Sequence, residues 1–150
     1  MKAGRWVAVG VVIVLAWVGL AYCAGPADAH EYRRTAVQTA QAGLNAVRTA
    51  ALAGVADRDG KLVDPYLSVV IGDSAGAVAS AQDELAAQFP PDAATRALRD
   101  ELTPLLVEAA RRIGNLDLAT SAGDDAGTDA VVAGLRQVGD QLDDFVQRHR

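Results

Sequence analysis

The sequence has few of the residues that build metal, haem and redox sites. Its 150 residues include one cysteine and two histidines. A single thiol excludes an intramolecular disulfide, and it excludes the Cys-x-x-Cys-His motif that attaches haem. A ferritin-like metal site needs Glu-x-x-His pairs, and neither His30 nor His149 has that spacing. We therefore expect no metal ion, no cofactor and no catalytic residue.

Aromatic residues are also scarce, at 5% of the chain, although 51% of the residues are hydrophobic. Much of that hydrophobic content is alanine, and runs of β-branched residues are missing after the N-terminal segment. This composition favours helices that pack closely together. No window alternates apolar and polar residues for long enough to predict a strand. The sequence therefore predicts an all-α protein.

Positive charge is in deficit. The net charge is −5, and beyond Ala29 there are 12 Lys and Arg residues against 18 Asp and Glu residues. These charges are interspersed and form no basic stripe, so nucleic acid is not an expected partner. An acidic surface does not attract anionic lipid, so we expect membrane contact to come from the N-terminal segment.

Residues 6–25, WVAVGVVIVLAWVGLAYCAG, carry no charge. A helix of this length reaches about 30 Å, the thickness of the hydrocarbon core of a bilayer. Lys2 and Arg5 precede the segment, and Asp28 and Glu31 follow it, so the positive-inside rule places the rest of the chain outside. We expect residues 1–29 to be a single-pass membrane anchor and residues 30–150 to be an extracytoplasmic domain.

Two other fates of this segment stay open. Ala27-Asp28-Ala29 is a signal-peptidase type of site, and cleavage after Ala29 would release a secreted domain. Leu20-Ala21-Tyr22-Cys23 resembles the lipobox of bacterial lipoproteins, which implies a lipid anchor on Cys23. The resemblance departs at Tyr22, where that family has a small residue. All three fates place the domain in or beyond the cell envelope.

Four segments beyond residue 29 carry apolar or small residues at heptad spacing. We predict helices at about 29–57, 64–89, 92–113 and 128–149. The stripes are Val37, Ala40, Leu44, Val47, Ala51 and Gly54; then Ile71, Val78, Ala81 and Leu85; then Leu98, Leu102, Leu105, Ala109 and Ile113; and finally Val131, Leu135, Val138, Leu142 and Phe145.

Local signals set the expected helix ends. Gly60 is an expected stop, and Asp64, Asp92 and Thr128 are expected N-caps. Pro65 suits the first helical position. Pro104 predicts a kink in the third helix, or two shorter helices that meet at Thr103. Residues 114–127 are expected to form the longest loop, although their first part can extend the helix.

Stripes of this length with mostly short connections predict an antiparallel up-down four-helix bundle. This architecture resembles extracytoplasmic four-helix sensor domains. Those domains signal through a second membrane span to a cytoplasmic output, and this sequence contains neither. The resemblance therefore implies action through another subunit.

Gly72-Asp73-Ser74-Ala75-Gly76 fits the G-x-S-x-G pattern. It resembles the nucleophile elbow of hormone-sensitive-lipase-like esterases, which implies Ser74 as a nucleophile on a strand-to-helix turn. The oxyanion segment and the alternating strands and helices of that family are missing here. We therefore interpret the stretch as helix, with Gly72 and Gly76 as a small-xxx-small pair and Ser74 off the main stripe.

Residues 57–62, DRDGKL, resemble the middle of an EF-hand loop. The resemblance implies calcium ligands, but the positions of the first acid and the last glutamate hold Val55 and Tyr66. We interpret the stretch as a solvated turn between helices. The Asp pairs 124–125 and 143–144 are interpreted as a loop and a solvated helix face. Arg111-Arg112 is placed near the end of the third helix, where cations suit the dipole.

The expected function is a non-enzymatic module of the bacterial cell envelope that binds or scaffolds a partner protein. The alternative is a small-ligand carrier with an apolar pocket at Pro104 or around Gly72 and Gly76. Such a pocket would be lined by Leu102, Leu105, Val78 and Leu135. A serine esterase that uses Ser74 is a distant third hypothesis.

Overall fold

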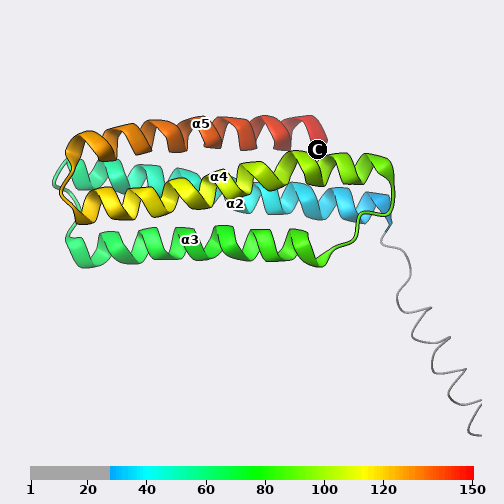
Figure 1. Ribbon diagram of the computed structural model, residues 1–150, viewed down its shortest axis with the longest axis horizontal. Coiled ribbons are helices and arrows are strands. Elements are labelled where there is room, and N and C mark those ends of the chain that lie inside the picture. Colours follow the sequence, from blue (N-terminus) through cyan, green and yellow to red (C-terminus); the bar gives the residue numbers. More distant parts are fainter. Residues whose placement is uncertain (1–27) are drawn as a thin grey trace, which may run out of the picture.

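Four long helices account for most of residues 28–150, the part of the chain that the computed structural model describes (Figure 1). They are α2 (Ala29–Arg58), α3 (Asp64–Ala87), α4 (Ala93–Ser121) and α5 (Asp125–His149). Residues 28–150 contain no strand, so the prediction of an all-α fold with four helices is confirmed. None of these four helices is long and apolar enough to cross a membrane. The expected anchor, with Cys23, lies outside the described residues.

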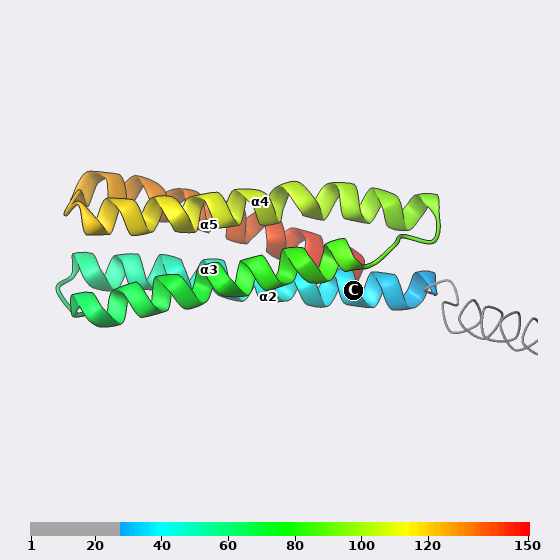
Figure 2. The same cartoon turned by 60° about the horizontal axis from the view of Figure 1, so that its bottom comes forward.

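Successive helices run in opposite directions and are joined by short connections (Figures 1 and 2). Helix α2 contacts all three other helices, and α4 does the same. Within the described bundle, α3 and α5 have no Cα atoms within 8 Å of each other. Helices α2 and α4 therefore meet across the middle, and α3 and α5 lie on opposite sides of them.

Two glycines end helices in the same way. Gly60 has a φ of +66°, and its N–H donates to the carbonyl oxygen of Asp57 at 2.8 Å, while Lys61 N–H donates to that of Ala56 at 2.8 Å. Gly123, with a φ of +63°, closes α4 with the same pair of bonds. This C-terminal motif needs a left-handed residue, which glycine supplies without a steric penalty. The predicted stop at Gly60 is confirmed.

The start of α4 also follows its sequence signal. The Asp92 carboxylate accepts a hydrogen bond from Thr95 N–H at 2.8 Å, and Asp92 N–H donates to Thr95 Oγ1 at 3.2 Å. This reciprocal pair is a capping box. The predicted cap at Asp64 is wrong by one residue, because Asp64 is already helical and Val63 is the N-cap. The carbonyl of Val63 accepts the first helical bonds there.

The boundary between α4 and α5 differs most from the sequence prediction. Helix α4 runs through residues 114–121, which were expected in the loop, and α5 begins before Thr128. Asp124 is the N-cap of α5 and accepts a hydrogen bond from Gly127 N–H at 2.9 Å, while Thr128 is buried inside the helix. Gly127 costs a helix only about 1 kcal/mol relative to alanine, and this cap offsets that cost.

Pro104 does not divide α4. The helix is continuous from Ala93 to Ser121, so the prediction of two shorter helices is wrong. Pro104 itself is exposed, whereas Leu102 and Leu106 on either side of it are fully buried. Burial of these leucines holds both halves of the helix on the bundle, and the ring of the proline faces solvent.

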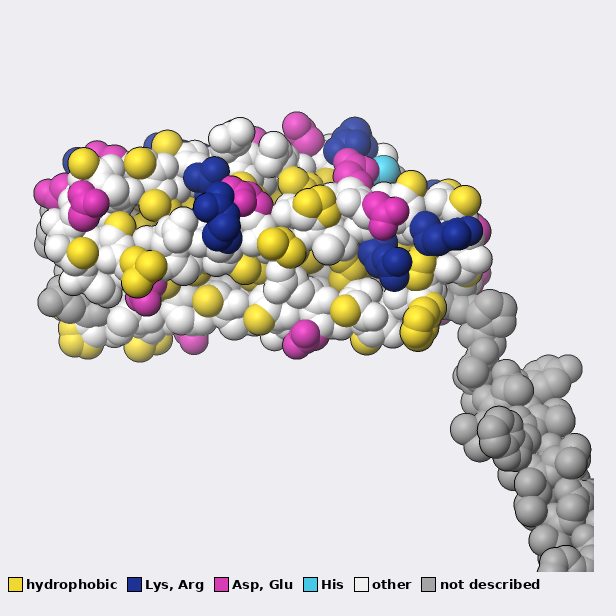
Figure 3. Space-filling view, in the orientation of Figure 1, with side chains coloured by type: hydrophobic (Ala, Val, Ile, Leu, Met, Phe, Trp, Pro, Cys, Tyr) yellow, Lys and Arg dark blue, Asp and Glu magenta, His cyan; other side chains and the backbone are white. Residues whose placement is uncertain are grey.

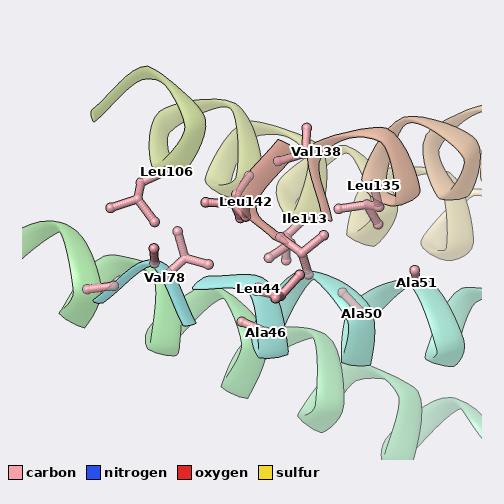
Figure 4. Packing of buried hydrophobic residues seen from close by; sticks show 14 of the residues in the cluster. Leu44, Ala46, Ala50, Ala51, Val78, Leu106, Ile113, Leu135, Val138 and Leu142 are labelled. Atoms are coloured by element: carbon pink, nitrogen blue, oxygen red, sulfur yellow. The ribbon is translucent and has the colours of Figure 1, made fainter. Parts of the chain in front are cut away.

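The predicted stripes form the core (Figure 4). Every member is buried except Val37, Leu105 and Val131, which are partly buried and pack against the core. Sequence analysis missed several fully buried residues, namely Tyr32, Leu106, Leu116 and Val146. These residues widen each stripe beyond the narrow heptad seam, as expected for a helix that faces two or three neighbours.

Glycines inside the helices fall into two groups. A Cβ at Gly54 would lie 2.8 Å from Val132 Cγ2 and 3.0 Å from Leu116 Cδ1, so this glycine allows α2 to approach α4 and α5 closely. Within the described bundle, a Cβ at Gly72 or Gly76 would have no neighbour within 4 Å. The small-xxx-small pair of Gly72 and Gly76 therefore does not pack against another helix within the described bundle.

We expect Gly72→Ala and Gly54→Ala to change stability in opposite directions. Gly72→Ala should raise the free energy of unfolding by about 1 kcal/mol, because alanine is the better helix former and meets open space. Gly54→Ala should lower it by about 1–2 kcal/mol, because overpacking exceeds the gain in helix propensity. Urea unfolding followed by circular dichroism measures both. Equal shifts in the two variants would contradict the close packing at Gly54.

The end of α5 is tied to α4 by a charged cluster. Arg148 Nη2 donates to Glu101 Oε1 at 2.5 Å, and His149 Nε2 lies 3.3 Å from Glu101 Oε2. The His149 ring also packs against Phe145, with 4.6 Å between the ring centroids. Partial burial raises the pKa of Glu101, but the hydrogen bonds and charges of Arg148 and His149 outweigh it. The pKa of Glu101 is therefore lowered from its usual value.

A lowered pKa in the folded state means that ionised Glu101 stabilises the fold above the pKa it has when unfolded. This contribution is lost as the pH falls through the lower, folded pKa. Glu101→Gln should therefore lower the free energy of unfolding by about 0.5 kcal/mol at pH 7, a small value because the cluster is partly exposed. The variant should also lose less stability than the parent between about pH 5 and pH 3. Parallel acid-unfolding curves for the two proteins would contradict this.

Candidate functional site

Ser74 is a helical, buried residue in the middle of α3. Its hydroxyl donates to the carbonyl oxygen of Val70 at 2.8 Å, and its side chain is 4% exposed. The helical interpretation of GDSAG is confirmed. The prediction that Ser74 lies off the main stripe is wrong, because Ser74 continues the buried series between Ile71 and Val78.

Both histidines lie far from this serine in the described bundle. His149 is on α5, which does not contact α3. His30 is in the first turn of α2, whereas Ser74 shares a groove with Ala46. Sixteen residues separate His30 from Ala46, which corresponds to about 24 Å along the helix. The geometry does not bring a histidine to the Ser74 hydroxyl.

The other charged motifs are occupied by local contacts. Lys61 Nζ lies 2.7 Å from Asp59 Oδ2, and this hydrogen bond and charge lower the pKa of Asp59. Asp57 is in the last turn of α2, so residues 57–62 form the end of that helix and a turn. Within residues 28–150, no group of three or more His, Cys, Asp or Glu residues is placed to hold a metal ion.

The arginine and aspartate pairs also belong to the scaffold. Arg111 and Arg112 both contact Glu108 at 2.7 Å, in the middle of α4 and not near its end as expected. Asp143 accepts a hydrogen bond from Arg48 at 2.8 Å, which links α5 to α2 and lowers the pKa of Asp143. These charged side chains pair with one another, and they do not converge on a common point as the groups of a catalytic site would.

Charge is distributed unevenly over the four helices. Residues 35–56 of α2 contain one charged residue, Arg48, and residues 65–82 of α3 contain one, Asp73. Helices α4 and α5 contain eight and seven charged residues, counting Lys, Arg, Asp and Glu. Figure 3 shows no Lys or Arg along the lower edge of the molecule, where α3 lies in Figure 1. We refer to the exposed surface of residues 35–56 and 65–82 as the α2–α3 face.

A groove of about 310 Å³ runs between the two helices of this face. Ala42, Asn45, Ala46 and Thr49 line it from α2, and Val70, Asp73, Ser74 and Ala77 line it from α3. Most of these side chains are small, so the groove is shallow. Asp73 is the one charged side chain among these lining residues. The Ser74 hydroxyl in the groove is already bonded to the helix backbone.

The outer ridge of α3 borders this groove and is apolar. Val63, Tyr66 and Val69 are each more than half exposed, and Gly72 and Gly76 follow at helical spacing. These apolar residues meet solvent in the single chain, beside the exposed polar residues Ser68 and Asp73. The two glycines leave room for the backbone of another helix to approach.

Three other grooves lie on the described surface, and the largest of them, of about 810 Å³, is lined in part by Asp57, Pro65 and Ser121. The groove between α2 and α5, of about 260 Å³, is lined in part by Val47, Leu52, Leu135 and Gly139. Of the four residues predicted to line an apolar pocket, Leu135 alone lines any of the grooves found. Val78 and Leu102 are fully buried in the core instead. A groove of about 240 Å³ does lie beside Pro104, lined in part by Leu85, Thr103 and Leu106, so the small-ligand carrier stays an alternative.

No protein-family model, curated protein or solved structure matches the chain. The α2–α3 face is therefore the candidate functional site on physical grounds alone. We did not predict this face from the sequence, because it forms only where two separate helices lie side by side and no single motif marks it. The sequence does contain a signal for this face. Both helices have a long interval with little charge, and successive helices of an up-down bundle lie side by side.

Replacing Ser74 by alanine should leave the protein folded and slightly more stable. The Ser74 hydroxyl bonds only to the carbonyl four residues earlier, a contact that competes with the helix, and alanine is the better helix former. We expect a rise of up to about 0.5 kcal/mol in the free energy of unfolding. Hydrolysis of a nitrophenyl ester should be the same for both proteins. A loss of ester hydrolysis in Ser74→Ala would contradict the structural role of this serine.

Proposed function

We propose that the chain is a non-enzymatic, extracytoplasmic module of the bacterial cell envelope that binds a helix of a partner protein on its α2–α3 face. Residues 6–25 attach it to the membrane in this proposal. The observation that carries the binding role is the scarcity of charge on two adjacent helix segments, with one charged residue in about six turns of α2 and one in about five turns of α3. The attachment is supported by the uncharged N-terminal segment of the sequence.

The groove defines the chemistry of the partner. Small side chains on both walls admit a helix that itself presents small or apolar residues, because such helices approach closely. The Asp73 carboxylate would lose water on binding, and burial of an unpaired charge is unfavourable. We infer that the partner helix places a Lys or Arg side chain opposite Asp73.

The size of the face fits one helix. The ridge from Val63 to Gly76 spans 13 residue steps, or about 20 Å. A partner helix of roughly 14 residues would therefore cover the ridge. Helices α4 and α5, with their dense charges, would remain in water on the other side of the bundle.

Site-specific photocrosslinking tests this face in cells that produce the full chain. A benzoylphenylalanine at Ala77 should give a defined adduct with one protein, because Ala77 lines the groove. The same probe at Val107, which is 53% exposed on α4, should not give that adduct. The partner captured at Ala77 should contain a helix with a basic residue.

Charge variants provide the control for this experiment. Ala42→Arg places a cation in the groove and should reduce the Ala77 adduct at least tenfold. Ala133→Arg makes the same change at an exposed position of α5 and should leave the adduct unchanged. Equal adducts from Ala77 and Val107, or an adduct that survives Ala42→Arg, would overturn the assignment of this face.

A further inference from the structure

The connection between α3 and α4 exposes an aromatic side chain. Phe89 is 84% exposed, the largest exposed fraction of any large hydrophobic residue within residues 28–150. It is followed by Pro90 and Pro91, which fix their own φ angles and restrict the residue before each of them. Single exposed apolar residues are common on protein surfaces. The position of Phe89 in the bundle distinguishes it from them.

Phe89 lies at the end of the bundle where the chain enters. Figures 1 and 2 show the α3–α4 connection beside the first turns of α2, whereas the other two connections lie at the opposite end. The pKa of Asp92 is consistent with this arrangement. Hydrogen bonds from Thr95 lower it most, and the charge of Arg33 in α2 lowers it further, as expected if the starts of α2 and α4 are neighbours.

The short link between the uncharged N-terminal segment and α2 limits the distance between this end of the bundle and a membrane. Four residue steps separate Gly25, the last residue of the uncharged segment, from Ala29 at the start of α2. Four extended residues span at most about 14 Å. The polar headgroup layer on each side of a bilayer is about 6 Å thick. If residues 6–25 span the bilayer, this end of the bundle lies at or just above the headgroups.

Charges near this end do not draw the bundle to lipid. Arg33, Arg34 and Arg96 lie near this end together with Asp28, Glu31 and Asp92, and the end of α3 adds Asp83 and Glu84. Strong attraction to anionic lipid is therefore not expected. Contact would instead come from the apolar surface of Phe89 and the adjacent prolines. Aromatic side chains are favoured at the boundary between headgroups and hydrocarbon.

We propose that Phe89 inserts into the outer interface of the bilayer to which the chain is attached, and that it acts as a second membrane contact beside residues 6–25. This inference rests on the membrane attachment proposed above. A bundle held at two points stands end-on at the membrane, with the α2–α3 face directed sideways. That orientation presents the face to a partner in the same envelope layer.

A nitroxide spin label at position 89 tests the contact in the full chain. Cys23→Ala removes the native thiol, and Phe89→Cys then supplies the labelling site. Val63→Cys is the matched control, because Val63 is 68% exposed in the connection at the opposite end. Both proteins are reconstituted in phosphatidylcholine vesicles, and each label is measured for collision with oxygen, which enters lipid, and with a nickel chelate, which stays in water.

We expect the ratio of oxygen to nickel collisions to be at least threefold higher at position 89 than at position 63. Equal ratios in chains that float with the vesicles would overturn the Phe89 contact and leave the attachment intact. Lipid-like ratios at both positions would also overturn it, because the bundle would then lie flat. Chains that fail to float with the vesicles would overturn the attachment itself and the Phe89 contact with it. Circular dichroism of both labelled proteins verifies that the helices are retained.

Discussion

The close packing of α2 against the other three helices is the constraint on which the rest of the bundle depends. The inward side of α2 consists largely of alanine, with Gly43 and Gly54 at the tightest positions. Small residues bring the helix axes together, so that leucines from α4 and α5 fill the space that α2 leaves (Figure 4). Larger residues on α2 would separate α4 from α2 and open the middle of the bundle.

This packing divides the surface into two unlike parts. Helices α4 and α5 carry most of the charge, and contacts such as Glu101 with Arg148 hold them together. Helices α2 and α3 meet through small side chains and show an outer surface with little charge. This uneven distribution of charge is the observation on which the proposed binding role of the α2–α3 face rests. The start of α2 and the connection that contains Phe89 lie at the same end of the bundle, so the two ends of the bundle also differ.

Much of the fold could be predicted from the sequence because its signals are local. The heptad stripes identified the four helices, and nearly all of their members are buried. Gly60 and Asp92 marked a helix end and a helix start, because a left-handed residue and a capping side chain act within a few residues. Where local signals compete, prediction failed. Gly127 and Thr128 resemble a helix start, but the cap at Asp124 and the burial of Thr128 extend α5.

The sequence by itself determined the helical composition and the four segments, and its single cysteine excludes an intramolecular disulfide. Only the tertiary structure decided that Ser74 is buried between α2 and α3, that Gly54 is packed and Gly72 is open, and that α4 continues through Pro104. It also brought two intervals of low charge together into one face, and it placed the α3–α4 connection, which contains Phe89, beside the start of α2. The reason is physical. A residue's periodicity gives its side of a helix, but its surroundings depend on which neighbours that side meets.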